Sequence, residues 1–190
     1  MSSEQIQKNF QEAKDVLEAF TADDSTLEAI VNAGAMLVAA LKSGNKIISC
    51  GNGGSMSDAM HFAEELSGKF RNEREAMAAV SISDPSHITC TANDYGFEYI
   101  FSRYVEALGK EGDVLLAIST SGNSANVQHA IEAAKKKGLK VIGLTGNDGG
   151  KMAGLCDVEI RVSHRGYSDR IQEVHIKIIH SLIHFVELHT

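Results

Sequence analysis

Two kinds of hydrophobic spacing divide the chain at about residue 45. Before this point, apolar residues recur every three or four positions, which predicts an amphipathic helix over residues 4–20. A second helix is predicted to start near Ser25, behind an aspartate pair that can cap it, and to end at Gly44. These helices precede any strand and cannot bury both apolar stripes on each other. We therefore expect the N-terminal helical hairpin (residues 1–44) to pack on the rest of the domain or in a subunit interface.

From residue 45 to residue 190, short apolar runs alternate with helical stretches. The runs that predict strands are 46–50, 78–81, 114–118, 140–144 and 158–162, and the stretches that predict helices are 56–67, 86–93, 99–108, 125–137 and 169–188. Strands that alternate with helices imply right-handed crossovers. The prediction is an α/β fold with a doubly wound, five-stranded parallel sheet flanked by helices. No linker or repeat interrupts residues 1–190, so we expect a single domain with an α/β core over 45–190.

Composition narrows the possible functions. The 190 residues carry a formal net charge of −7, which argues against a nucleic-acid partner, because such proteins need a basic face. The apolar runs are too short for a membrane span, and the polar N-terminal segment does not have the pattern of a signal peptide. The three cysteines are scattered, which is typical of free thiols in a reducing compartment. We therefore expect a cytoplasmic protein with neither membrane nor nucleic acid as a partner.

The loop that follows the third predicted strand has the composition of a phosphate site. Ser119-Thr-Ser-Gly-Asn-Ser124 contains four hydroxyl side chains, those of Ser119, Thr120, Ser121 and Ser124, and a predicted helix follows at once. A strand that leads through such a loop into a helix directs backbone N–H groups and the positive end of the helix dipole toward one point. An acidic protein can bind a phosphate in this way without a cluster of lysines.

A glycine loop follows the first predicted strand, at Gly51-Asn-Gly-Gly-Ser55. The third glycine of a dinucleotide-binding fingerprint is replaced by Met56, and no Walker lysine follows. The loop is either a tight turn or, together with the Ser119–Ser124 loop, part of a sugar-phosphate site. Parallel strands present their carboxyl ends at the same edge of a sheet, so we expect the two loops to lie together. A further polar pair, Asn93-Asp94, is either a turn former or a ligand contact.

Two of the predicted helices carry a possible metal cluster. His61 and Glu65 are four residues apart and share a helix face, whereas Glu64 is expected to face solvent. In the last helix, Gln172 and His180 differ by only about 80° around the helix axis. The four side chains can form a site for a borderline cation such as zinc. The alternative for His61 and Glu65 is a surface ion pair. The alternative for the last helix is one buried core histidine and one solvated histidine.

Taken together, the motifs resemble the phosphoheptose isomerase family of the sugar isomerase (SIS) superfamily. The resemblance is carried by Cys50–Ser55, Asp58–Leu66, Asn93-Asp94, Ser119–Ser124 and Arg170–His175, in this order along essentially the whole chain. It implies a flavodoxin-like α/β fold and a cytoplasmic homotetramer with active sites at subunit contacts. It also implies one bound zinc ion per subunit.

The resemblance further implies an aldose–ketose isomerase that converts D-sedoheptulose 7-phosphate to D-glycero-D-manno-heptose 7-phosphate through an enediol, the first step toward the ADP-heptose of the lipopolysaccharide core. The implied catalytic pair is Glu65, as the carbon base, and His180. The implied metal ligands are His61, Glu65, Gln172 and His180. The implied substrate contacts are Asn52, Gly53, Gly54, Ser55, Glu65, Asn93, Asp94, Ser119, Thr120, Ser121, Ser124 and Gln172. One departure from the family pattern is Lys69, where relatives usually have arginine.

Two other activities fit parts of this pattern. A non-catalytic SIS adaptor that binds the replication initiator shares the length and the loops but lacks the catalytic Glu and His, whereas both Glu65 and His180 are present here. Arabinose 5-phosphate isomerase usually carries a C-terminal pair of regulatory domains, and this chain stops at Thr190. We therefore expect the heptose phosphate isomerase.

Overall fold

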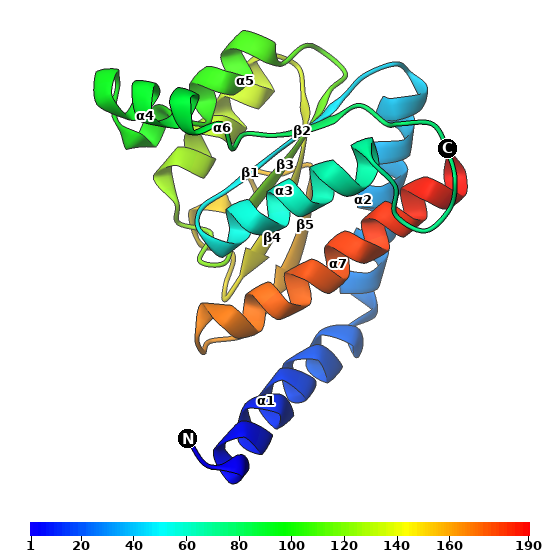
Figure 1. The fold of residues 1–190 in the computed structure, drawn as a ribbon, viewed down its shortest axis with the longest axis vertical. Coiled ribbons are helices and arrows are strands. Elements are labelled where there is room, and N and C mark those ends of the chain that lie inside the picture. Colours follow the sequence, from blue (N-terminus) through cyan, green and yellow to red (C-terminus); the bar gives the residue numbers. More distant parts are fainter.

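A parallel five-stranded sheet lies at the centre of the protein, in a computed structural model that describes all 190 residues (Figure 1). Its strands are β1 (Ile47–Gly51), β2 (Ala79–Ser81), β3 (Val114–Ser119), β4 (Lys140–Gly146) and β5 (Val158–Val162). They are ordered β2-β1-β3-β4-β5, and every neighbouring pair is parallel. The predicted α/β class and the number of strands are confirmed.

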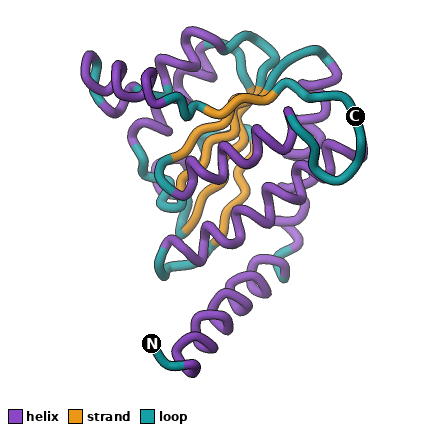
Figure 2. Tube along the Cα trace, viewed as in Figure 1, coloured by secondary structure: helices purple, strands orange, loops and turns teal.

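Helices cover both faces of the sheet (Figure 2). They are α1 (Ser3–Thr21), α2 (Asp24–Lys42), α3 (Gly54–Ser67), α4 (Pro85–Asp94), α5 (Ser102–Leu108), α6 (Ala125–Lys136) and α7 (Ser168–His189), with short 3-10 helices η1 (Phe97–Tyr99) and η2 (Gly150–Met152). On one face α2, α3 and α7 pack on the strands, and on the other face α5 and α6 lie together.

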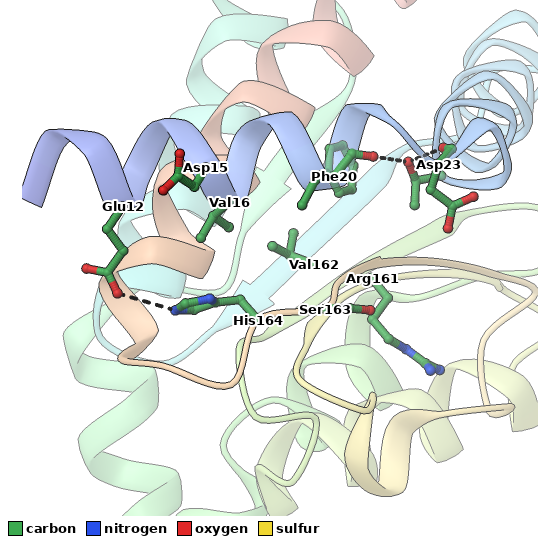
Figure 3. Close-up of a pocket in the computed structure, with 11 residues that line it drawn as sticks. Glu12, Asp15, Val16, Phe20, Asp23, Arg161, Val162, Ser163 and His164 are labelled. Carbon is green, nitrogen blue, oxygen red and sulfur yellow. Dashed lines mark hydrogen bonds and ion pairs between the residues drawn. The ribbon is translucent and has the colours of Figure 1, made fainter.

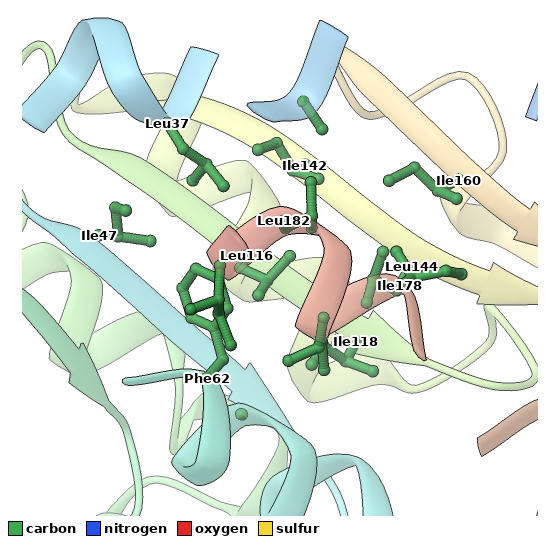
Figure 4. Close-up of a cluster of buried hydrophobic side chains, with 14 of the residues drawn as sticks. Leu37, Ile47, Phe62, Leu116, Ile118, Ile142, Leu144, Ile160, Ile178 and Leu182 are labelled. Atoms are coloured by element: carbon green, nitrogen blue, oxygen red, sulfur yellow. The ribbon is translucent and has the colours of Figure 1, made fainter. Parts of the chain in front are cut away.

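The alternation of side chains along the strands creates two hydrophobic clusters. Ile47 and Leu116 point to the face covered by α2, α3 and α7, and their neighbours Ile48 and Leu115 point to the opposite face. Figure 4 shows the first cluster, in which Phe62 of α3 and side chains of α7 cover the strands. All these strand residues are fully buried, as expected for a parallel sheet with helices on both faces.

Three boundaries differ from the predicted ones in a way that affects the site. Helix α3 begins at Gly54 rather than at residue 56, so the end of the glycine loop forms the first turn of the helix. Strand β4 continues to Gly146, two residues beyond its predicted end. The predicted helix 99–108 is divided into η1 and α5, and η1 follows Gly96, whose φ of 107° is in the region that favours glycine.

Helix α1 projects from the body of the protein (Figure 1). Only Val16 and Phe20, near its C-terminal end, are buried, whereas Phe10 is 74% exposed and Ile6 is 45% exposed. The N-terminal part of the apolar stripe of α1 therefore does not pack on the rest of this chain. The expectation that residues 1–44 lie in a subunit interface stays a prediction.

Helix α2 crosses α7 at a very short distance. A Cβ atom on Gly34 would lie 2.6 Å from Cδ1 of Phe185, so only glycine allows this approach. By length and composition α2 could cross a membrane, but Ala33 and Leu37 are fully buried in the core cluster that it shares with α7. Its hydrophobicity is that of a core helix.

We expect Gly34→Val to lower the free energy of unfolding by about 1–3 kcal/mol, because the added side chain must displace the Phe185 ring. Thermal and urea unfolding measure the loss. Ala35→Val is the matched control, since it places the same β-branched residue on the exposed side of α2. Equal losses in both variants would contradict the close crossing.

Candidate active site

Two loops meet at the carboxyl edge of the sheet, as predicted. The glycine loop follows β1 and the Ser119–Ser124 loop follows β3, and these two strands are neighbours. Asn52 and Asn126 join the loops through two reciprocal amide hydrogen bonds of 2.9 and 2.8 Å. Asn126 also accepts a hydrogen bond from its neighbour Val127 N–H. This buried asparagine was not predicted, because nothing in the sequence indicates which side chain of the second loop faces the first.

The hydroxyl loop is held in a tight conformation. Ser119 Oγ and Ser124 Oγ lie 3.0 Å apart, and Ser121 Oγ accepts a hydrogen bond of 3.1 Å from Asn123 N–H. Gly122 has a φ of 63°, and a Cβ atom there would collide with the carbonyl oxygen of Gly149. The glycine is therefore required both by its backbone angle and by the approach of the next loop.

The same loop presents unpaired hydrogen-bond donors. The backbone N–H groups of Thr120, Ser121, Ser124, Ala125 and Asn126 have no acceptor within the chain. The last three lie at the N-terminus of α6, where the helix dipole favours an anion. No lysine or arginine side chain forms a salt bridge or hydrogen bond with the loop side chains, and Lys151 contacts Asn123 only through its backbone N–H. The groups that the loop offers to a ligand are therefore N–H and hydroxyl groups, and its role as a phosphate site stays a prediction.

Asn93 and Asp94 lie apart from these loops. They are exposed at the C-terminal end of α4, where Asn93 Nδ2 donates to Asp94 Oδ1 at 2.7 Å. Neither side chain forms a hydrogen bond with the two loops of this chain. Their substrate contact stays a prediction.

Helices α3 and α7 bring three of the four predicted metal ligands together. His61 Nε2 lies 3.0 Å from His180 Nε2 and 3.6 Å from Glu65 Oε1. Burial, and then the neighbouring His61, lower the pKa of His180 below its ordinary value. Gln172 lies elsewhere on α7. Its amide lies against Gly54, where a Cβ atom would be 2.6 Å from Nε2, and it has no hydrogen bond to the other three residues.

His61 and His180 are spaced as two ligands of one zinc ion would be. Two ring nitrogens bound to one tetrahedral zinc at about 2.0–2.1 Å lie roughly 3.3 Å apart, close to the separation of His61 and His180. Carboxylate and imidazole are both ordinary zinc ligands. The carboxylates that lie within reach of the same ion as His61 are those of Glu64 and Glu65. Gln172 makes no hydrogen bond to His61, Glu65 or His180, and the four-ligand set stays a prediction.

Glu64 faces solvent, as expected, yet it also contacts the cluster. Its side chain is 63% exposed, and its Oε1 lies 3.0 Å from His61 Nδ1. A carboxylate at this distance favours a proton on Nδ1, which leaves the lone pair of Nε2 directed at His180 and Glu65. Glu64 thus orients the ring of His61, a contact that the sequence analysis did not predict.

Asp58 lies one helical turn before His61. Burial raises the pKa of Asp58 to about 6, against an opposing effect of His61, and its Oδ2 is buried without a hydrogen-bond partner. The carboxyl group therefore titrates close to neutral pH in the folded protein.

His175 ties α7 to the sheet. It is fully buried, and its Nε2 donates to the carbonyl oxygen of Thr145 in β4 at 2.9 Å. Burial lowers the pKa of His175 to about 4. The neutral ring anchors the N-terminal half of α7, and with it Gln172, beneath the edge that carries the hydroxyl loop.

Two cavities lie along α1, away from the two loops. One of about 440 Å³ separates α1 from the end of β5, and Figure 3 shows Glu12 and His164 facing each other across it. Another, of about 500 Å³, lies between α1 and α7 and is mainly apolar.

The sheet order and the two loops define the class of protein. The SIS domain family model matches residues 8–146, and the chain belongs to this family. A phosphoheptose isomerase from Proteus mirabilis is 60% identical over 187 residues, which are 98% of this chain and 97% of that protein. The chain is therefore also a member of the phosphoheptose isomerase family, a group of sugar-phosphate isomerases.

Two solved structures agree with this assignment. The structure of a phosphoheptose isomerase from Neisseria gonorrhoeae is 42% identical, with a TM-score of 0.91, and the match covers 97% of this chain and 98% of that one. That of a phosphoheptose isomerase from Francisella tularensis is 36% identical, with a TM-score of 0.93, and the match covers 99% and 100%. The predicted family is confirmed.

We expect Asn126→Leu to destabilise the protein by about 1–3 kcal/mol and to weaken the binding of inorganic phosphate about tenfold. The substitution leaves the half-buried amide of Asn52 without its partner and frees the two loops from each other. Unfolding curves and calorimetric titration measure both effects. Asn32→Leu, at an exposed position on α2, is the control and should change neither.

His175 makes stability fall at acid pH. Its folded pKa of about 4 is below the ordinary 6.5, so the unfolded chain binds the proton first as the pH falls between these values. The destabilisation approaches 1.4 kcal/mol per pH unit and reaches about 3 kcal/mol near pH 4. His175→Gln keeps a donor for Thr145 but does not titrate, so the stability of the wild type relative to this variant should decline from pH 7 to pH 4.

The comparison isolates His175 because Asp58, whose raised pKa has the opposite effect below pH 6, is present in both proteins. A difference in free energy of unfolding that does not change with pH would show that His175 is not held neutral.

Proposed function

We propose that the protein is the isomerase that converts D-sedoheptulose 7-phosphate to D-glycero-D-manno-heptose 7-phosphate, the first step toward the ADP-heptose of the lipopolysaccharide core. One observation carries the proposal: the glycine loop, which is joined to the loop of unpaired donors, and the acid–base cluster lie at two different levels of helix α3. Gly54, next to the loops, and His61 are about two turns, or roughly 10 Å, apart on α3. An extended seven-carbon sugar phosphate has a comparable length.

The hydroxyl loop would hold the phosphate, with Ser119, Thr120, Ser121 and Ser124 donating beside the free N–H groups. Asn52, Gly53, Gly54 and Ser55 would contact the middle of the sugar, as would Gln172, whose amide lies against Gly54. Asn93 and Asp94 are the remaining proposed contacts. This arrangement anchors one end of the substrate and leaves the carbonyl end at the α3–α7 cluster.

Glu65 is the proposed carbon base. It removes the proton from C1 of the ketose, and the electron pair of that C–H bond forms an enediolate, whose oxygen on C2 then takes a proton from the protonated ring of His180 to give the enediol. The lowered pKa of His180 makes its protonated ring a stronger acid toward this oxygen, and the neutral ring that remains can accept the proton from O1. Return of a proton to C2 and loss of the O1 proton give the aldose.

Zinc is the proposed metal, held by His61, Glu65 and His180, with Gln172 as the fourth ligand that the family resemblance implies. When bound, it would polarise the carbonyl and stabilise negative charge on oxygen. A carboxylate that binds zinc is a weaker base. Two arrangements satisfy both roles of Glu65: it leaves the metal when substrate binds, or the metal is structural.

We also propose a cytoplasmic homotetramer. The hollow between α1 and α7 is lined by Ile6 and Phe10, both of which are exposed in the single chain. A second copy would bury this apolar stripe. The three cysteines are free, which agrees with a reducing compartment.

The direct test is an isomerase assay with sedoheptulose 7-phosphate, with metal analysis of the same sample. We expect turnover of this substrate in preference to arabinose 5-phosphate, and zinc near one equivalent per chain. No turnover of sedoheptulose 7-phosphate by a folded, zinc-loaded sample would overturn the proposal.

We expect Glu65→Gln to reduce kcat by at least about 10³-fold, since the amide cannot accept the carbon proton. Loss of solvent-deuterium incorporation into the sugar would show that the proton-transfer step itself is blocked. Glu132→Gln is the control, because Glu132 is exposed on α6 and has no ion-pair partner. Full activity of Glu65→Gln would remove Glu65 from the role of base.

A further inference from the structure

The segment that links α3 to β2 is held by a buried ion pair. Arg74 Nε lies 3.4 Å from Glu187 Oε1, and their side chains are only 11% and 1% exposed. The Glu187 carboxylate also accepts hydrogen bonds from the backbone N–H groups of Arg71 and Asn72, at 3.2 and 3.1 Å. A residue near the C-terminus of α7 therefore fixes the backbone of this segment.

Arg74 attaches the same segment to α3. Its guanidinium donates to the carbonyl oxygens of Glu65 and Leu66, at 2.6 and 2.9 Å. These are carbonyl groups of the last turn of α3, which have no partner within the helix. The segment is thus fastened at once to the helix that carries Glu65 and to the helix that carries His180.

These contacts place Phe70 beside His180 of the proposed catalytic pair, and Arg71 beside Phe70. The Phe70 ring lies 5.8 Å from the ring of His180, and the Arg71 guanidinium lies 5.1 Å from the centre of the Phe70 ring. Arg71 Nη1 is 3.3 Å from His184 Nδ1 and 3.4 Å from His184 Nε2, one helical turn beyond His180.

Arg71 has no carboxylate partner. Glu187, the nearest acid that the contacts reveal, is occupied by Arg74 and by backbone amides, and Arg71 itself forms no salt bridge. Nη1 is almost equally distant from both ring nitrogens of His184, so this contact uses little of the donor capacity of the guanidinium.

We propose that Arg71 is a further catalytic residue, whose guanidinium donates to the enediolate oxygen that forms at the His180 end of the substrate. The inference rests on the isomerase function proposed above. Arg71 exchanges no proton. It stabilises charge that exists only after Glu65 has taken the carbon proton, so its effect belongs to the transition state and not to the bound sugar.

The test is steady-state kinetics of Arg71→Gln and Arg71→Lys on sedoheptulose 7-phosphate, with inorganic phosphate as a competitive inhibitor. We expect kcat to fall about 10²-fold in Arg71→Gln and about tenfold in Arg71→Lys, which keeps the charge but loses the planar fork. KM and the inhibition constant of phosphate should change less than about threefold, because the phosphate loop is untouched.

Arg165→Gln is the matched control, since Arg165 is exposed and unpaired in the segment before α7. A kcat of Arg71→Gln within threefold of that of Arg165→Gln would overturn the proposal, and so would a rise in KM alone. An inactive wild type would instead refute the isomerase function. Melting temperatures of all variants within about 2 °C of the wild type exclude loss of the fold as the cause of a lower kcat.

Discussion

The packing of α3 along α7 is the constraint on which the rest of the site depends. At one end of the contact the amide of Gln172 lies against Gly54, and two turns further His61 meets His180. Beyond them the Arg74–Glu187 pair joins the ends of both helices. A shift of one helix along the other would separate every one of these pairs. Both helices are held in place by the sheet, into which Phe62 and Ile178 are buried.

The proposed phosphate site, the Ser119–Ser124 loop, depends on backbone conformation and not on helix packing. Its donors are backbone N–H groups and hydroxyls, which keep their positions only if the loop conformation is unique. Gly122 allows the turn, and the amide pair of Asn52 and Asn126 joins this loop to the glycine loop. Because no cation is needed, an acidic protein can carry this site without a basic patch. Binding and chemistry are thus supplied by separate parts of one sheet edge and helix pair.

Two histidines of α7 show how burial controls the protonation of a side chain. His175, entirely inside the core, is held neutral as a structural link to β4. His180, partly buried beside another histidine, has a more moderately lowered pKa and stays accessible for proton transfer. Two histidines of one helix therefore have different roles, and their depth below the surface distinguishes them.

The order of strands and helices, the two loops and the shared face of His61 and Glu65 were all determined by the sequence, since they follow from periodicity and from glycine and hydroxyl spacing. The family motifs located the same residues. Periodicity measures only the angle around a helix axis, however. Gln172 and His180 are close in angle, but eight residues separate them by about 12 Å along the axis. Only the packing of α7 on α3 decides that they meet different parts of α3. Asn126 and Arg71 contact Asn52 and His184 on other elements, and nothing in the chain indicates those contacts. Glu64 contacts His61 on the neighbouring turn of the same helix.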